Sequence, residues 1–234
     1  MKFNIMALLF LATSAGAAEP VIVTPDTAEL IERCAPKVDV ETLGAIVRTE
    51  SSGHVFVLSD DGPARLPWQQ RKHMIRSIYP GSAAEASEIA RKLIDDGHLV
   101  GIGLTQINSQ NLNGLGVTIN QLLDPCMNLA VGARLLRSLY QKALRSGRYP
   151  TPDRAVGAAL SAYNTGSFSD GFANGYVSRV LANMSAGVPR LRATSEPTRG
   201  MSPASADGGG KNRIVSKRDE SALKARTASL DVVW

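Results

Sequence analysis

The 234-residue chain is poor in the side chains on which several kinds of active site depend. Its three histidines are scattered along the sequence, so neither a Ser-His-Asp nor a Cys-His arrangement is apparent. Its two cysteines stand far apart with no third or fourth ligand nearby, which argues against a zinc site. Aromatic residues make up only 5% of the chain. We therefore expect no metal, and because the Gly101-x-Gly103 pattern does not continue as a dinucleotide fingerprint, we expect no cofactor either.

Long apolar runs are also missing. A membrane-spanning helix needs about 20 apolar residues, and the most apolar segment, residues 5–12, is too short. It follows a positive start, Met1-Lys2, and precedes the small residues 14–18, which is the order of a secretory signal peptide. We predict that residues 1–18 are a signal peptide, that the protein reaches the periplasm, and that no stable membrane span remains after cleavage. The alternative, a retained anchor, is disfavoured by the segment's length.

Cys34 and Cys126 are the only cysteines. An even number in an exported chain favours a disulfide, and this one would close a loop of about 90 residues. Two buried thiols are the alternative.

The net charge of +5 is concentrated near the C-terminus. From Val188 to Trp234 the chain has nine Lys/Arg against five Asp/Glu, and Pro, Ser, Gly and Thr dominate. Such a segment lacks the apolar side chains that offset the entropy of ordering, so we predict a disordered basic tail over residues 187–234. A nucleic-acid-binding role is disfavoured by the few aromatics, the absence of a motif and the predicted export. We expect no nucleic-acid partner.

Between a lead-in at residues 19–29 and the tail, the apolar spacing predicts a mainly α domain. A first helix runs through Leu30, Ile31 and Cys34, and a second begins after the N-cap Asp39. Further helices are predicted over residues 83–96, 126–146, 151–165 and 176–184. Residues 54–58 read as a short strand and residues 60–63 as a turn.

Glu50 is a carboxylate on an apolar helix face, three and four residues after Val47 and Ile46. Burial disfavours the ionised carboxylate, and the negative potential at a helix C-terminus acts in the same direction. A raised pKa suits a proton donor. The alternative is a buried glutamate paired with an arginine such as Arg48 or Arg179, although adjacent helix positions such as Arg48 do not face each other.

Four segments occur in a specific order: Glu50-Ser51, the Gly-Leu-Thr-Gln-Ile-Asn run of residues 103–108, the Ala-Tyr-Asn-Thr-Gly run of residues 162–166, and Tyr176. This order resembles the family 1 lytic transglycosylases of the Slt type, whose fold is similar to goose-type lysozyme. The long spacer after Glu50 is similar to that of the specialised transglycosylases of type IV secretion and conjugation systems. The resemblance covers roughly residues 30–185. Thr105 departs from it, because the family has methionine there.

The resemblance implies a lysozyme-like catalytic domain over residues 30–186, with a small strand or loop element. It implies cleavage of the MurNAc-GlcNAc β-1,4 bond of peptidoglycan with formation of a 1,6-anhydro ring. Glu50 would act first as acid and then as base. The expected partners are glycan strands and, through the tail, components of a type IV secretion machine.

The residues expected to contact substrate are Ser51, Gln106, Asn108, Tyr163, Asn164 and Tyr176. Each of the first five has a structural alternative. Ser51 could cap its helix, Tyr163 could pack in the core, and Asn164 could belong to a helix C-cap with Gly166. Loop stabilisation is the alternative for Gln106 and Asn108, and for Asn108 the two roles stay evenly balanced.

Two other functions compete with this one. A hydrolytic lysozyme on the same fold usually needs a second carboxylate about 5–5.5 Å or 6.5–9.5 Å from the first. The candidates look like turn, helix-end or N-cap residues, and none lies in a matching motif: Asp60, Asp61, Asp95, Asp96 and Asp124. A non-catalytic glycan-binding scaffold is the other alternative, and Glu50 together with Gln106 and Tyr176 argues against it.

Overall fold

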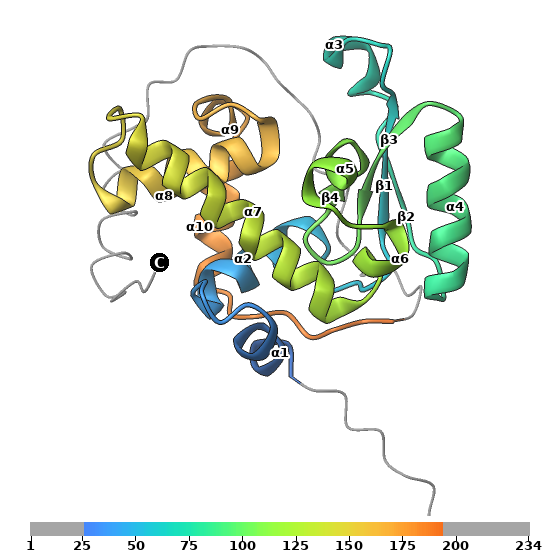
Figure 1. Cartoon of the computed structure of the whole chain (residues 1–234), viewed down its shortest axis with the longest axis horizontal. Helices are drawn as coiled ribbons and strands as arrows, with labels where there is room; N and C mark the ends of the chain where they lie inside the picture. Colours follow the sequence, from blue (N-terminus) through green and yellow to red (C-terminus); the bar gives the residue numbers. More distant parts are fainter. Residues whose placement is uncertain (1–25, 194–234) are drawn as a thin grey trace, which may run out of the picture.

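The computed structural model describes residues 26–193 (Figure 1). The predicted signal peptide, most of the lead-in and the tail beyond residue 193 lie outside this range. Within it, no helix has the length and apolar character needed to cross a membrane.

Helices make up most of the described chain. Their bounds are α1 Thr27–Cys34, α2 Val40–Glu50, α3 Trp68–Arg71, α4 Ala83–Asp95, α5 Leu112–Leu115, α6 Ile119–Leu122, α7 Pro125–Arg145, α8 Pro152–Thr165, α9 Asp170–Ala173 and α10 Tyr176–Met184, with a 3-10 turn at Ser109–Asn111. The strands are β1 Leu58–Pro63, β2 Arg76–Ile78, β3 His98–Ile102 and β4 Ile107–Asn108. The prediction of a mainly α fold with a small strand element is confirmed.

The elements form two packed parts joined by the long helix α7. In Figure 1 the sheet and α4 lie on one side, and α8, α9 and α10 lie on the other. A helical core gathers apolar side chains of α1, α2, α7, α8 and α10, and a second core lies between the sheet, α4 and α6. Tyr163 and Phe56 contact both cores, so they lie at the seam where the two parts meet.

The predicted helix starts are confirmed by their caps. The carboxylate of Asp39 accepts from Thr42 N at 2.8 Å at the start of α2, and that of Asp124 accepts from Met127 N at 2.7 Å at the start of α7. Thr151 caps α8 through its hydroxyl. An oxygen-bearing N-cap side chain satisfies one of the backbone N–H groups that a helix start leaves unpaired.

The sheet has the order β2-β1-β3-β4 and is antiparallel throughout, with Leu58 opposite both Ile78 and Ile102. The predicted turn at residues 60–63 is wrong, because these residues belong to β1. The predicted strand at residues 54–58 overlaps β1 only at Leu58. Asp, Gly and Pro are rare in strands; here cross-strand partners hold Asp60, and a bulge between Asp60 and Pro63 accommodates Gly62 at φ +76°.

Cys34 and Cys126 form a disulfide, which confirms the predicted pairing. It ties the end of α1 to the first turn of α7 across a sequence separation of 92 residues. In the chain-entropy model a loop of this size contributes about 4–5 kcal/mol to stability.

Residues 186–193, which we name the C-terminal strap, run back from α10 along α2. Arg48 donates from Nη2 to Ala186 O at 2.9 Å and from Nε to Gly187 O at 3.0 Å. Val188 packs so closely on Gly44 of α2 that a Cβ there would come within 2.7 Å of it. The predicted tail boundary at residue 187 therefore falls inside a segment that lies against α2 of the folded domain.

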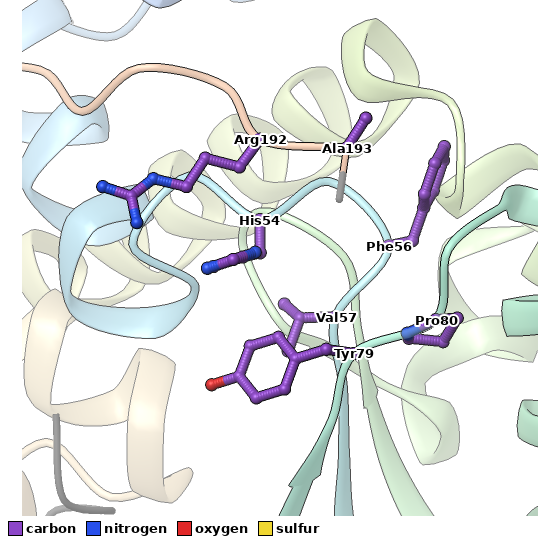
Figure 2. Close-up of a pocket in the computed structure, with 7 residues that line it drawn as sticks. All are labelled: His54, Phe56, Val57, Tyr79, Pro80, Arg192 and Ala193. Carbon is purple, nitrogen blue, oxygen red and sulfur yellow. The ribbon is translucent and has the colours of Figure 1, made fainter. Parts of the chain in front are cut away.

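The far end of the strap pairs with the loop that follows Glu50. Arg192 N donates to Gly53 O at 2.8 Å, and Val55 N donates to Arg192 O at 2.9 Å. Figure 2 shows Arg192 and Ala193 alongside His54, whose ring also meets Tyr79 edge-on with the centroids 4.9 Å apart. The strap thus constrains both α2 and the loop through which the chain leaves it.

Gly53→Ala is expected to destabilise the fold more than Gly97→Ala. Both glycines have left-handed φ angles, +86° and +83°, so an alanine at either one costs about 1–2 kcal/mol in backbone strain. A Cβ at Gly53 would also lie 2.1 Å from Arg190 O, whereas a Cβ at Gly97 meets nothing within 4 Å. Overpacking of this kind adds about 1–3 kcal/mol. Urea unfolding of the two variants measures the difference, and equal free energies of unfolding would rule out the strap contact.

Candidate active site

Glu50 is the last residue of α2, and the helix end is tightly closed around it. Ser51 has non-helical backbone angles and its hydroxyl donates to Val47 O at 2.9 Å, while its oxygen accepts from Gly53 N at 3.2 Å. Ser51 is buried and uses both bonds to cap the helix, which is the structural alternative raised for it. Its contact with substrate stays a prediction.

The side chain of Glu50 is held by Tyr176, the first residue of α10. The tyrosine hydroxyl donates to Glu50 Oε1 at 2.5 Å, and only 2% of Tyr176 is exposed. Gly175 precedes it at φ +76°, a left-handed conformation that lets the chain turn sharply into the helix. The structure therefore brings together two residues that lie 126 positions apart and that the sequence placed in one site.

The pKa of Glu50 is raised from 4.5 to about 7. Desolvation by burial is the largest cause, and the negative charge of Asp61 raises it further. The hydrogen bond from Tyr176 and the charge of Arg179 act in the opposite direction. Arg179 donates instead to Asn174 O and lies beneath the ring of Tyr176, and none of the ion pairs among residues 26–193 involves Glu50. The alternative of a glutamate neutralised by an arginine therefore does not hold.

Tyr163, on α8, takes a different place from Tyr176. Its hydroxyl donates to Thr105 O at 2.8 Å, so it holds the loop between β3 and β4 against α8. Burial raises the pKa of Tyr163, and the charge of Glu50 raises it further, which places Glu50 within its electrostatic reach. Tyr163 thus combines a packing role with a position beside the carboxyl group.

The loop of residues 103–106 is rigid because its polar groups are paired within the protein. Gln106 has φ +48°, and its Nε2 donates to Val57 O at 3.1 Å and to Gly103 O at 2.8 Å. In this structure the amide nitrogen of Gln106 stabilises the loop, which was the alternative to substrate contact.

Thr105 is fully buried and bonds to Asn128 of α7, a residue that the sequence analysis missed. Its hydroxyl donates to Asn128 Oδ1 at 2.6 Å, and Asn128 Nδ2 donates to Ile102 O and Leu122 O. Gly132, one turn further along α7, leaves the space that Thr105 fills. Threonine in place of the family's methionine thus fits a polar network. The sequence signal that could have identified Asn128 is its position, as an asparagine, on the apolar face of a long predicted helix.

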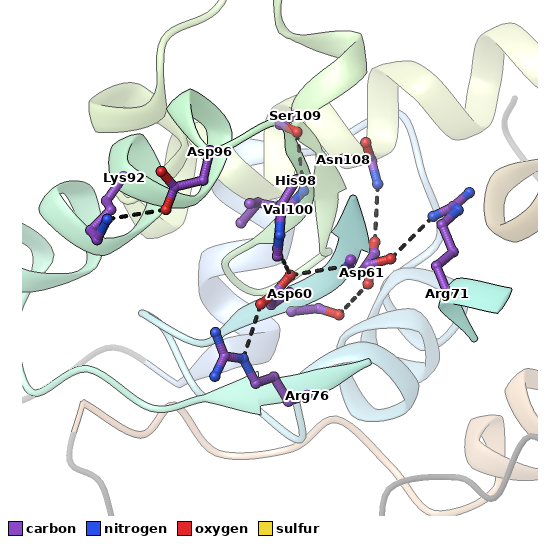
Figure 3. Close-up of polar contacts among 12 residues, drawn as sticks. Asp60, Asp61, Arg71, Arg76, Lys92, Asp96, His98, Val100, Asn108 and Ser109 are labelled. Atoms are coloured by element: carbon purple, nitrogen blue, oxygen red, sulfur yellow. Dashed lines mark hydrogen bonds and ion pairs between the residues drawn. The ribbon is translucent and has the colours of Figure 1, made fainter. Parts of the chain in front are cut away.

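Asp61 is the second residue that the sequence analysis did not place in the site. It lies on β1 rather than in a turn, and Ser59, through its hydroxyl, and Asn108, from Nδ2 at 3.1 Å, both donate to its carboxylate (Figure 3). Burial is the largest cause that raises the pKa of Asp61. Its charge acts on Glu50, so the site contains two interacting carboxyl groups. The bond to Asp61 gives Asn108 a role in holding this group.

Asp60, the neighbour of Asp61, points to the other side of β1. Its carboxylate accepts from Arg76 Nε at 2.9 Å and contacts His98 Nδ1 at 2.7 Å. Alternation along a strand sends adjacent side chains to opposite faces. Figure 3 shows the separation: Asn108 and Arg71 meet Asp61, while His98 and Arg76 meet Asp60.

Asn164 lies at the exposed end of α8 and acts on the site through one intermediary. Its Oδ1 accepts from Asn174 Nδ2 at 3.0 Å, and Asn174 Oδ1 accepts from Tyr176 N at 2.9 Å. Gly166 at φ +75° ends the helix, so the predicted C-cap is also present.

Among residues 26–193, no three His, Cys, Asp or Glu side chains gather in a way that could hold a metal ion.

Comparison with known proteins gives one family and several relatives. The family model described as "Transglycosylase SLT domain" matches residues 29–184. Protein virB1 of Agrobacterium fabrum is 36% identical over 169 residues, which are 71% of this chain and 62% of that protein. Protein virB1 of Rhizobium radiobacter is 32% identical over 189 residues, 80% of this chain and 72% of the relative.

The type IV secretion system protein virB1 of Brucella suis biovar 1 is 32% identical over 179 residues, which cover 71% of this chain and 70% of the relative. The chain thus spans between about three fifths and three quarters of the length of these relatives. No solved structure matches the chain.

Glu50→Gln is expected to remove a pH-dependent loss of stability. Between about pH 4.5 and 7 the folded wild type keeps a proton on Glu50 that the unfolded chain releases, so its free energy of unfolding falls as the pH rises through this window. Glutamine does not titrate. The melting temperature of Glu50→Gln relative to wild type should therefore climb from pH 4.5 to 7 and level off above.

Glu88→Gln, which changes an exposed side chain of α4, controls for the loss of one charge. A constant difference between Glu50→Gln and wild type across this range would contradict the raised pKa of Glu50.

Proposed function

Since this chain belongs to the Transglycosylase SLT domain family, we propose that it is a lytic transglycosylase that cleaves peptidoglycan with Glu50 as its acid and base. The observation that supports this role is a half-buried carboxyl group at a helix end, which is bonded to Tyr176 and whose pKa is raised to about 7. Such a group is protonated in an appreciable fraction of molecules near neutral pH, and it can also exist as a base there.

In the first step, protonated Glu50 donates its proton to the oxygen of the β-1,4 bond between MurNAc and GlcNAc, and the C1–O bond breaks. The leaving GlcNAc carries that proton as its 4-hydroxyl. The carboxylate of Glu50 then takes the proton of the C6 hydroxyl while O6 bonds to C1, which closes the 1,6-anhydro ring. Glu50 ends protonated, as it began, and no water is consumed.

Tyr176 supports both steps through one hydrogen bond. Its hydroxyl stabilises the ionised carboxylate after the first transfer, and it fixes the position of Oε1. Burial and the charge of Asp61 favour the protonated form that the first step needs. These opposing influences set the pKa of Glu50 near neutral pH, where the same group can donate a proton in the first step and accept one in the second.

The wider role that we infer is local opening of the cell wall for a type IV secretion machine. The support is the identity to virB1 proteins, one of which is named as a type IV secretion system protein. Wall cleavage of this kind takes place in the periplasm, which agrees with the signal peptide predicted at residues 1–18.

We further propose a set of side chains that shape the substrate site: Ser51, Gln106, Asn108, Tyr163 and Asn164. We also propose that the basic tail contacts the secretion machine.

Glu50→Gln is expected to abolish release of soluble fragments from purified peptidoglycan, a loss of at least about 100-fold for removal of a general acid. Wild type should release fragments that end in 1,6-anhydro-MurNAc, each one water lighter than the reducing-end form, as measured by mass spectrometry. Glu41→Gln, the same change at an exposed position of α2, serves as the matched control. Fragment release by Glu50→Gln at the wild-type rate would refute the assignment of Glu50.

Asp61 makes hydrolysis the second candidate, because it supplies the second carboxylate that was missing from the sequence-based argument. In that reaction Asp61 would activate a water, and the products would carry reducing ends.

For a transglycosylase, Asp61→Asn should keep the anhydro ends. It should also move the alkaline limb of the pH–rate profile to lower pH, because the variant loses a charge that raises the pKa of Glu50. If the wild type instead released fragments with reducing ends, and Asp61→Asn released none, the result would favour the hydrolase.

A further inference from the structure

The turn between β1 and β2, residues 64–75, is a compact surface element that neither the core nor the proposed mechanism uses. We name it the Trp68 turn. It carries the short helix α3 at the end of the sheet (Figure 1). Ala64 N donates to Gly97 O at 2.9 Å, which ties one end of the turn to the start of β3, and Arg71 and Met74 pack over Gly62 of β1. The turn is therefore held in place against the sheet.

The Trp68 turn presents its largest apolar side chains to solvent. Trp68 is 49% exposed and Met74 is 45% exposed, the two highest values among the large hydrophobic residues in the described part of the chain. The guanidinium of Arg71 lies 5.2 Å from the centre of the Trp68 ring, a cation–π contact that holds the indole in a defined place. An indole that is exposed and yet oriented is a ready contact surface.

The turn is connected to the proposed active site through a short chain of contacts. Arg71 Nη1 donates to Asp61 O at 3.3 Å, and Figure 3 shows Arg71 on the side of β1 that carries the Asp61 carboxylate. The charge of Arg71 lowers the pKa of Asp61, and the charge of Asp61 in turn raises that of Glu50. Arg71 therefore links the Trp68 ring to Asp61, the group that interacts with Glu50.

The charge of this region has one sign. Residues 62–84 contain no Asp or Glu, and their four basic side chains are Arg65, Arg71, Lys72 and Arg76. Arg76 is paired with Asp60 and Arg71 lies on Trp68, while Arg65 is exposed and Lys72 half-buried. Peptidoglycan strands carry carboxylates on their stem peptides, so a strand that passes this turn meets complementary charge.

We propose that the Trp68 turn is a second glycan-contact surface, on which Trp68 stacks against a sugar ring of the same strand at a distance from the scissile bond. A pyranose ring has a face of C–H groups that matches a flat indole, and its hydroxyls remain at the edges, in water. The apolar patch consists of two side chains, whereas a stable protein interface buries about 800 Å² on each partner. The proposal rests on peptidoglycan being the substrate.

Tryptophan fluorescence reports on this contact directly, because the chain has only two tryptophans, Trp68 and Trp234. Trp234→Phe leaves Trp68 as the sole indole, and Glu50→Gln in the same chain prevents cleavage. Titration with soluble, uncross-linked glycan strands should shift and quench the emission in a saturable manner. Constant emission while the strands demonstrably bind, as followed by co-sedimentation, would overturn the proposal.

Kinetics separate a contact with distant sugars from a merely structural role. Trp68→Ala, in the otherwise wild-type chain, should raise KM for long strands by about two- to tenfold, the scale of one aromatic contact. Its kcat, and its KM for a short tetrasaccharide that cannot reach the turn, should stay unchanged. Trp68→Phe should restore part of the loss. Met127→Ala, which removes a 38% exposed side chain on α7, is the matched control.

An unchanged KM for long strands in Trp68→Ala would refute the second surface while leaving the catalytic assignment intact. An equal rise of KM on long and short substrates would also refute it, because it would indicate a disturbance of Glu50 itself. Failure of the proposed function has a different signature, since wild type would then cut neither substrate.

Discussion

Partial removal of one carboxyl group from water is the constraint on which the rest of this structure depends. Glu50 stands at the end of α2, where the negative end of the helix already disfavours its ionised form, and burial raises its pKa to about 7. Such a group is unfavourable for stability when it ionises, so the surroundings must hold it by other means. The Tyr176 hydroxyl bonds to Glu50 directly, and the Ser51 cap and the C-terminal strap hold the helix that carries it.

The two packed parts of the fold meet around this group and supply opposing influences. The helical part contributes Tyr176, whose hydrogen bond stabilises the carboxylate, and the sheet contributes Asp61, whose charge opposes it. The loop of residues 103–106 lies at the seam and is fastened to α8 through Tyr163 and to the joining helix α7 through Asn128. A relative movement of the two parts would therefore change the distance between the carboxyl groups and with it the balance of their protonation.

Where sequence patterns are local, they predicted the structure well. Helices α2, α4, α7, α8 and α10 follow from apolar spacing and from oxygen-bearing caps such as Asp39 and Asp124, because these signals act within one or two turns. The strand β1 was misread for the converse reason. Asp60, Asp61 and Gly62 disfavour a strand by themselves, and only partners brought from β3 and β2, such as His98 and Arg76, make the pairing stable.

The sequence by itself determined the helices, the Cys34–Cys126 pairing and the grouping of Glu50 with Tyr176 and the residues 103–108 and 162–166. The helices follow from chain-local periodicity, the pairing from the presence of just two cysteines in a chain predicted to be exported, and the grouping from the resemblance that the motif order carries. Only the tertiary structure decided that Asp61 interacts with Glu50, that Gln106 bonds to its own loop, and that Tyr163 holds Thr105 rather than the carboxyl group. These outcomes depend on which strand face a side chain occupies and which backbone carbonyl lies within about 3 Å of it, and spacing along the chain does not encode either one.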